Sequence, residues 1–276
     1  MGKSGGSGGY IRAAWEGLAV GDFDTILYDK TGHRATVTMN RPEARNGITQ
    51  LMLDELLIAL EDAASDENLR VLILRGAGKD FCPGADVKAY AAGTGGISNP
   101  KTFHVSSILH EAPIVTVAAI RGACAGAAIG WAAACGFRVC DDTAKFNTAF
   151  LGVGLSGDMG GPWFLPRILG AAKARELYML TGRFDAAEAH RIGLVSRLFT
   201  EAEFEDGVDE IATKLVNTAP IALRSMKANF LDAERLPLRD FIDLETGRHI
   251  ASGRTEDSRE AFRAFVEKRT PIFNGR

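Results

Sequence analysis

The sequence has few of the residues that build disulfide frameworks or zinc sites. It contains only four cysteines, Cys82, Cys124, Cys135 and Cys140, among 276 residues. They form no CxxC pair, and none has the histidine spacing of a zinc site. Because all four stand in apolar or glycine-rich surroundings, we expect them to be reduced core residues. We expect no metal site.

Long apolar runs and an excess of positive charge are also missing. No apolar run approaches the roughly 18 residues of a membrane-spanning helix, and no charged-then-apolar leader opens the chain. The formal net charge is −3, which gives no electrostatic reason to expect a nucleic-acid partner. We therefore expect a soluble, cytoplasmic protein with neither nucleic-acid nor membrane partners.

The composition is that of a chain that folds around a large core. Hydrophobic residues make up 46% of it. The opening MGKSGGSGG is glycine- and serine-rich, and we expect residues 1–20 to form a flexible leader. We expect residues 21–200 to form the main folded core and residues 201–276 a helical region.

Strand and helix patterns alternate as far as about residue 200. Strands are predicted at Thr25–Tyr28, Ala35–Met39, Val71–Leu74, Val115–Ile120, Phe137–Cys140 and Lys145–Asn147. Helices are predicted at Ile48–Ala64, Thr102–Glu111, Ala128–Cys135, Pro162–Leu169 and Ala172–Leu180. In the first of these, Asp54, Glu55 and Glu61 are expected mostly on the polar face. Such units suggest stacked sheets with helices outside them.

The chain from Glu201 onward is predicted to be entirely helical. Its helices are expected at about residues 201–217, 220–234, 237–251 and 256–267. They are amphipathic, so their apolar faces need a surface to cover them, either the core or another subunit.

Two loops could place backbone N–H groups at the ends of strands. Phe81–Asp86 follows a buried strand, and Gly122–Ala128 leads into an apolar helix. Small residues let a backbone approach a ligand closely, and helix N-termini carry unpaired N–H donors. Two donors that meet at one carbonyl oxygen would form an oxyanion hole. The alternative is that the glycines and alanines merely allow tight turns.

Five segments in order resemble the crotonase (enoyl-CoA hydratase/isomerase) superfamily. They are NRPEARNGIT, FCPGADVKAY, AAIRGACAGAAIGWAAACGFRVC, AKFNTAFLGVGLSGDMGG and FVEKR, and together they cover about Thr25 to Arg269. The resemblance implies an α/β spiral of ββα units with a C-terminal all-helical trimerisation region. It also implies a homotrimer or a hexamer.

The same resemblance implies a site for an acyl-coenzyme A thioester. By motif position, the two oxyanion N–H donors are those of Ala85 and Ala127. Coenzyme A is expected over Ala44–Arg45 and Gly84–Asp86, and it belongs to the substrate, so no separate cofactor is implied. Gly126, Phe150 and Trp163 are expected to line the substrate pocket.

Two catalytic glutamates of the family's hydratases have no counterpart here. Gly130 and Phe150 occupy their places, and neither side chain can carry a proton. Because positioned acid–base groups are each worth roughly 10²–10⁴-fold in rate, efficient hydration of a double bond is not expected.

One carboxylate, Asp158 in GLSGDMGG, stands where several relatives with other chemistry have a functional aspartate. The local pattern is most similar to the ring-epoxide (1,2-epoxyphenylacetyl-CoA) isomerase branch. Asp158 would then be the sole acid–base residue, and burial would raise its pKa. The alternative is that Asp158 caps the following helix.

The resulting prediction is an enzyme that stabilises an acyl-CoA enolate and moves a double bond with Asp158 as its base. A hydrolase or dehalogenase that uses the same aspartate remains open, as does hydratase as a family-level description. A non-catalytic CoA-binding or RNA-binding member is the alternative outside the enzymes. The sequence does not specify the acyl group.

Overall fold

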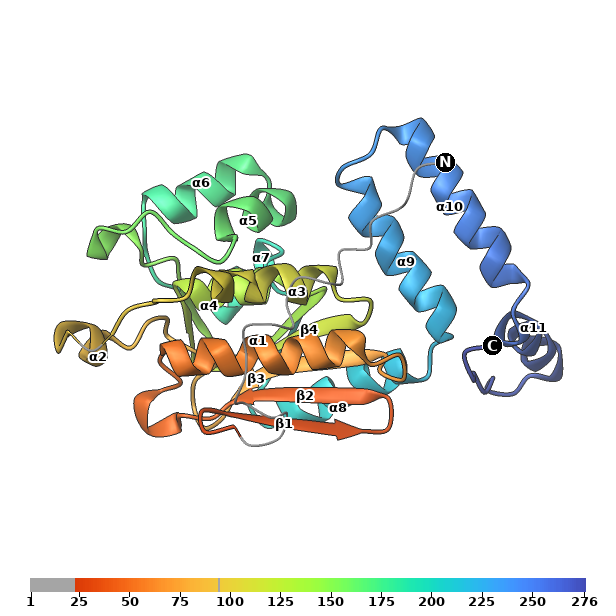
Figure 1. Ribbon diagram of the computed structural model, residues 1–276, viewed down its shortest axis with the longest axis horizontal. Helices are drawn as coiled ribbons and strands as arrows, with labels where there is room; N and C mark the ends of the chain where they lie inside the picture. The colour runs from red at the N-terminus through yellow and green to blue at the C-terminus, as the bar shows by residue number, and fades with distance from the viewer. Residues whose placement is uncertain (1–22, 94) are drawn as a thin grey trace.

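A six-stranded sheet forms the centre of the fold in the computed structural model, which describes residues 23–93 and 95–276 (Figure 1). Its strands lie in the order β1 (Ile26–Thr31), β2 (Arg34–Met39), β3 (Val71–Gly76), β4 (Val115–Ile120), β6 (Phe137–Asp141) and β9 (Arg197–Phe199). β1 and β2 are antiparallel and the other neighbours are parallel. The predicted leader at residues 1–20 lies outside the described residues.

A second, three-stranded sheet lies beside the first in the order β5 (Ala123–Ala125), β7 (Lys145–Asn147) and β8 (Phe184–Asp185). The structure thus has two sheets, as predicted. The sequence patterns did not predict β5, β8 or β9, which are only two or three residues long. Strands this short carry little alternation to detect, although β7, also three residues long, was predicted.

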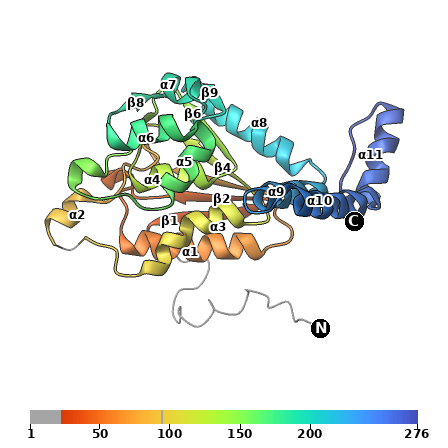
Figure 2. The same ribbon diagram turned by 90° about the horizontal axis from the view of Figure 1, so that it is seen from above.

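Helices cover both faces of the large sheet (Figure 2). On one face lie α1 (Gln50–Ser65), α3 (Val105–Glu111) and α4 (Ala127–Ala134), which share a core with Leu72 and Leu74 of β3. On the other face α8 (Phe204–Val216) packs on Val71 and Ile73. The prediction that this strand is buried on both faces is therefore confirmed.

The remaining connections are short helices. They are η2 (Pro42–Ala44), α2 (Val87–Ala91), η3 (Pro100–His104), η4 (Leu151–Val153), α5 (Gly161–Leu169), α6 (Ala171–Met179) and α7 (Ala186–Arg191). The helix predicted at Thr102–Glu111 is in fact η3 followed by α3. All four cysteines are buried and free, as predicted.

Glu55 differs from its predicted position on the polar face of α1. It is fully buried, and its carboxylate accepts hydrogen bonds from the backbone N–H groups of Asp24 (2.8 Å) and Thr25 (2.9 Å). Helical periodicity placed it outside, but the segment before β1 covers it and satisfies its charge.

Three helices project from the sheet region as a C-terminal arm, residues 220–267 (Figures 1 and 2). They are α9 (Pro220–Ala233), α10 (Leu238–Gly253) and α11 (Glu256–Glu267). The arm exposes large apolar side chains, among them Phe230, Leu238, Phe262, Phe265 and Val266. The projection begins at α9, since α8 packs on the sheet. The predicted division at residues 200 and 201 stays a prediction.

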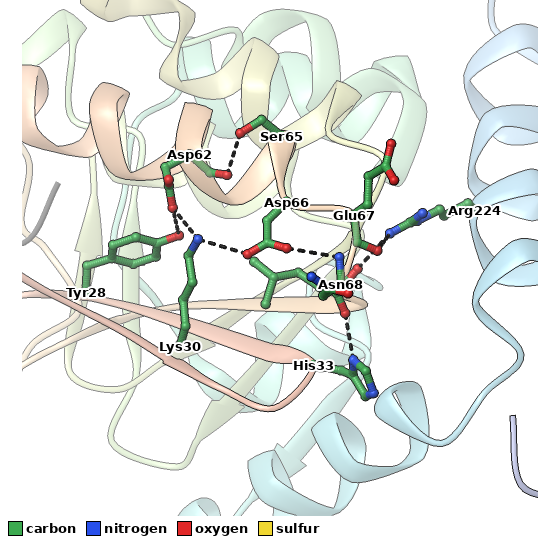
Figure 3. Close-up of polar contacts among 10 residues, drawn as sticks. Tyr28, Lys30, His33, Asp62, Ser65, Asp66, Glu67, Asn68 and Arg224 are labelled. Atoms are coloured by element: carbon green, nitrogen blue, oxygen red, sulfur yellow. Dashed lines mark hydrogen bonds and ion pairs between the residues drawn. The ribbon is translucent and has the colours of Figure 1, made fainter. Parts of the chain in front are cut away.

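Polar contacts fasten β1 and the arm to the core (Figure 3). The Tyr28 hydroxyl donates to Asp62 at 2.7 Å, and Lys30 pairs with Asp66 at 3.0 Å. Arg224 of α9 donates to the backbone carbonyl of Glu67. In the described part of the chain, no helix combines the length and the apolar character needed to cross a bilayer.

Candidate active site

The two glycine-rich loops run side by side in parallel register. The Cys82 N–H donates to the Ala123 carbonyl at 2.8 Å, and the Ala125 N–H donates to the Cys82 carbonyl at 3.0 Å. Two residues further on, Gly84 faces Gly126: a Cβ on Gly84 would stand 3.8 Å from the Gly126 Cα and 3.1 Å from the Ala125 oxygen. Both glycines have positive φ. Only glycine suits this close approach.

The N–H groups of Ala85 and Ala127 follow directly on these glycines. Ile48 bonds to the residues that flank Ala85, accepting from the Asp86 N–H at 3.1 Å and donating to the Gly84 carbonyl at 2.9 Å. The Ala85 N–H therefore points away from Ile48. Ala127 is the first residue of α4, where the N–H has no partner within the helix. The register thus places these two N–H groups on neighbouring loops, and their action as an oxyanion hole stays a prediction.

The segments predicted to hold coenzyme A lie against each other. A Cβ on Gly47 would stand 3.2 Å from the Asp86 Cα, and Arg41 pairs with Asp86 at 3.2 Å. Asp80 accepts hydrogen bonds from Arg45 (2.7 and 3.1 Å) and from the Ala123 N–H (2.7 Å). Although burial opposes it, these bonds hold the pKa of Asp80 below its usual value. Asp80 thereby joins three loops, a role that the sequence did not reveal.

A cavity of about 1130 Å³ adjoins these loops. Its lining includes more cationic than acidic side chains: Arg45, Lys79, Arg121, Lys145 and Arg183 against Asp80 and Glu201. Such a lining favours an anionic ligand, because its charges attract the ligand before contact.

Gly130 stands where the family's hydratases have their first glutamate, and the backbone of Met159 occupies the space beside it. A Cβ on Gly130 would overlap the carbonyl oxygen of Met159 and stand 2.8 Å from the Met159 Cβ. Ser106 holds that carbonyl with a 2.8 Å hydrogen bond from its hydroxyl. Phe150, at the second place, is buried, and its ring lies 3.9 Å from where a Gly126 Cβ would be. Neither position offers a carboxylate.

The Asp158 side chain does not cap the following helix, and its role as a base stays a prediction. The residue before α5 is Gly160, and no side chain caps that helix. The Asp158 Oδ1 atom is buried, with no hydrogen-bond partner among the described residues. Burial raises the pKa of Asp158 to about 6. A carboxylate with this pKa is still ionised at neutral pH and is a stronger base than an exposed one.

Tyr178 of α6 lies near Asp158, and no sequence pattern predicted this. Its ring stacks on Phe150 with centroids 6.4 Å apart, and its hydroxyl oxygen is buried without a hydrogen-bond partner in the described part of the chain. Burial, and then the nearby charge of Asp158, raises the pKa of Tyr178. Twenty residues separate Tyr178 from Asp158, and no local pattern links them.

Trp163 of α5 lies among other ring side chains. Its ring contacts His110 and Phe164, with centroids 5.3 and 4.8 Å away, and Arg167 stacks on it. It lines a second, apolar cavity of about 460 Å³ whose walls include Phe230 of α9. Leu155, three residues before Asp158, is half exposed. A substrate contact by Trp163 stays a prediction.

The chain is similar to known proteins over nearly its whole length. Residues 31–276 match the sequence family described as Enoyl-CoA hydratase/isomerase. A 1,2-epoxyphenylacetyl-CoA isomerase of Escherichia coli is 31% identical over 87% of this chain and 95% of that protein. A short-chain-enoyl-CoA hydratase of Clostridium acetobutylicum is 30% identical over 90% and 97%.

Solved structures of enoyl-CoA hydratases are also similar to this chain. The crystal structure of an enoyl-CoA hydratase from Bacillus anthracis aligns with a TM-score of 0.83 at 30% identity, covering 92% of this chain and 100% of that one. The fold predicted from the sequence is thus confirmed. The names of the relatives include both hydratases and isomerases, so they do not choose between the two reactions.

Proposed function

We propose that this chain, which belongs to the enoyl-CoA hydratase/isomerase family, shifts a double bond in an acyl-CoA thioester with Asp158 as its base. The observation that carries the proposal is the state of Asp158. One of its carboxylate oxygens, Oδ1, is buried without a hydrogen-bond partner among the described residues, and partial burial of the side chain raises its pKa to about 6. A buried polar atom without a partner lowers the stability of the fold, and ionisable groups with such perturbed pKa values are concentrated at functional sites.

In the proposed reaction, the thioester oxygen lies between the N–H groups of Ala85 and Ala127. Asp158 removes a proton from one carbon of the acyl chain, and the electron pair moves toward that oxygen to form an enolate. The two N–H groups stabilise the developing negative charge. Asp158 then returns the same proton to another carbon, so that the double bond moves and no atom is gained or lost.

The two missing glutamates favour isomerisation over hydration. Adding water requires one group to activate it and another to protonate the α-carbon, whereas a proton shift requires a single group that works twice. Gly130 and Phe150 offer no second carboxylate, and the backbone of Met159 leaves no room for one at position 130. The cationic cavity beside Arg45 supports the choice of an anionic CoA thioester as the substrate.

The test compares two reactions of the purified protein. We expect 3-enoyl-CoA to be converted to 2-enoyl-CoA much faster than crotonyl-CoA is hydrated. Asp158→Asn keeps the size of the side chain but removes the base, and it should lower the isomerisation rate at least about 10²-fold. Calorimetry should show that it still binds the CoA thioester.

Asp29→Asn is the matched control, because Asp29 is an exposed carboxylate on β1. It should retain the wild-type rate. Full turnover by the Asp158→Asn variant would show that another residue moves the proton. Efficient hydration of crotonyl-CoA by the wild type would refute the isomerase proposal, and hydrolysis of the thioester would favour a hydrolase.

A further inference from the structure

The apolar cavity of about 460 Å³ lies where α9 meets the core. Its walls come from the start of β4, the end of α4, the start of β6, α5 and α9, and it shares no lining residue with the cationic cavity beside Arg45. Its volume falls within the range of small-molecule sites, roughly 300–1,000 Å³, which are mostly apolar with a few polar groups. Phe137, Trp163 and Phe230 line it and are exposed, so a ligand can enter it from solvent.

Two cationic side chains, Lys227 of α9 and Arg138 of β6, line this apolar cavity. The Lys227 Nζ donates to the Ile114 carbonyl at 2.6 Å. Arg138 donates from Nε to the Leu194 carbonyl and from Nη1 to the Cys135 carbonyl, both at 2.6 Å. All three acceptors are neutral. In the described part of the chain, neither cation forms an ion pair with a carboxylate.

The two cations lie around the same cysteine. Burial raises the pKa of the Cys135 thiol to about 12, and the charges of Arg138 and Lys227 act against this rise. Both charges are therefore near one sulfur atom, because the effect of a charge falls with distance. The only carboxylate in the described lining is that of Glu234, which pairs with His110 at 2.9 Å. No counter-charge of the protein is left for the two cations.

Both cations still have hydrogen-bond donors to offer. Burial lowers the pKa of Lys227 to about 8, so the ammonium is mostly protonated at pH 7. An ammonium carries three donors, and the Ile114 carbonyl takes one of them. The Nη2 atom of Arg138 has no hydrogen bond within the described residues. Removing charges from water without a counter-charge is unfavourable, and an anionic ligand would supply that counter-charge.

A ligand complementary to this lining has an anionic head and an apolar tail. Its head would accept hydrogen bonds from Lys227 and Arg138, and its tail would pack on aromatic side chains such as Phe230. One negative charge suits the cavity better than two, because a dianion loses more hydration when it enters apolar surroundings. The volume lies near the lower end of the range for small-molecule sites, which favours a chain of medium length.

We propose that this cavity binds a free fatty acid of medium chain length, with its carboxylate at Lys227 and Arg138 and its chain among the aromatic side chains. The site is separate from the proposed active site, and the proposal does not depend on the reaction that the active site catalyses.

The experiment measures binding to the native protein by calorimetry at pH 7. The probes are octanoate, 1-octanol, which has the chain without the charge, and acetate, which has the charge without the chain. We expect octanoate to bind at least tenfold more tightly than 1-octanol, and acetate not to bind at the same concentrations. Saturation with free coenzyme A should leave the affinity for octanoate unchanged, because the two cavities share no residue.

Lys227→Met removes the ammonium and keeps an unbranched apolar side chain. It should weaken octanoate binding at least tenfold and leave the affinity for 1-octanol unchanged. Lys214→Met, at an exposed position of α8, is the matched control and should bind both probes as the wild type does. Melting curves establish that the variants are folded. If Lys227→Met does not fold, the ratio of the wild-type affinities for octanoate and 1-octanol decides.

Equal affinity of the wild type for octanoate and 1-octanol would overturn the proposal, because the cavity would then bind apolar chains without using its cations. Unchanged octanoate binding in Lys227→Met, or displacement of octanoate by coenzyme A, would place the fatty acid elsewhere. Absence of octanoate binding would refute the site, as it would if another copy of the chain covers the cavity. Tighter binding of octyl phosphate than of octanoate would overturn the choice of a carboxylate head.

Discussion

Gly130 lies against Met159 so closely that a Cβ at position 130 would overlap the Met159 carbonyl oxygen. Met159 is held there by the hydrogen bond from Ser106 and has a left-handed backbone, with φ of 49°. Family hydratases, by their resemblance to this chain, carry a glutamate at this position. Here the segment around Asp158 occupies the space that the glutamate would need, so the two arrangements exclude each other.

Gly130→Glu should therefore not create a hydratase. We expect it to destabilise the fold by at least about 1–3 kcal/mol, because an overpacked core forces backbone shifts. Urea unfolding and a crotonyl-CoA hydration assay measure the two effects. Gly247→Glu is the control, since nothing lies within 4 Å of its Cβ position on α10. A Gly130→Glu protein with wild-type stability would contradict the packing argument.

Ala127→Pro tests the oxyanion donor. Proline is tolerated at the first position of a helix, where the N–H has no partner within the helix, so the fold should survive. Loss of the donor should lower kcat for isomerisation by about 10²–10³-fold. Glu256→Pro makes the same change at the exposed first residue of α11 and should leave kcat unaltered. If both variants have the same kcat, the Ala127 N–H does not stabilise the oxyanion.

The pKa of Asp158, raised to about 6 by burial, predicts the pH dependence of the reaction. Only the ionised carboxylate accepts a proton. The value of kcat/KM for 3-enoyl-CoA should therefore rise about tenfold per pH unit below pH 6 and level off above it. A profile that is flat between pH 5 and 8 would show that Asp158 is not the base.

The same pKa predicts a change in stability. Asp158 binds its proton more tightly in the folded state than in the unfolded state, where the ordinary value is 3.8. Its favourable contribution is full below that value and is lost as the pH rises through 6. The Asp158→Asn side chain does not ionise, so the variant does not lose this stability. The melting temperature of the variant minus that of the wild type should therefore increase from pH 4 to pH 7. A constant difference would indicate an unperturbed carboxylate.

The exposed apolar side chains of the C-terminal arm predict assembly. We expect light scattering to give three or six times the mass of one chain, because a shared interface would bury Phe262, Phe265 and Val266 of α11. Phe262→Asp with Phe265→Asp should shift the protein to monomers. Arg263→Asp on the same helix is the control. A wild type that is monomeric at micromolar concentration would refute the expectation.

Much of the framework was determined by the sequence itself. Val71–Leu74 is apolar without alternation, and it became the central strand covered by helices on both faces. The two loops after β3 and β4 came together in register, and their small residues permit this close approach. These features can be predicted from the sequence because they depend on hydrophobic periodicity and on the backbone freedom of glycine, both of which are local properties.

Other features were decided only by the tertiary structure. The helical spacing of α1 predicts Glu55 at the surface, but the segment before β1 covers it. Strand β8 forms because Phe184 pairs with Phe146, which lies 38 positions earlier in the chain. Tyr178 packs beside Gly157, and Met159 excludes a side chain from position 130, by contacts between segments that are not adjacent in the sequence. Contacts of this kind arise when whole elements pack together, and no local pattern encodes them.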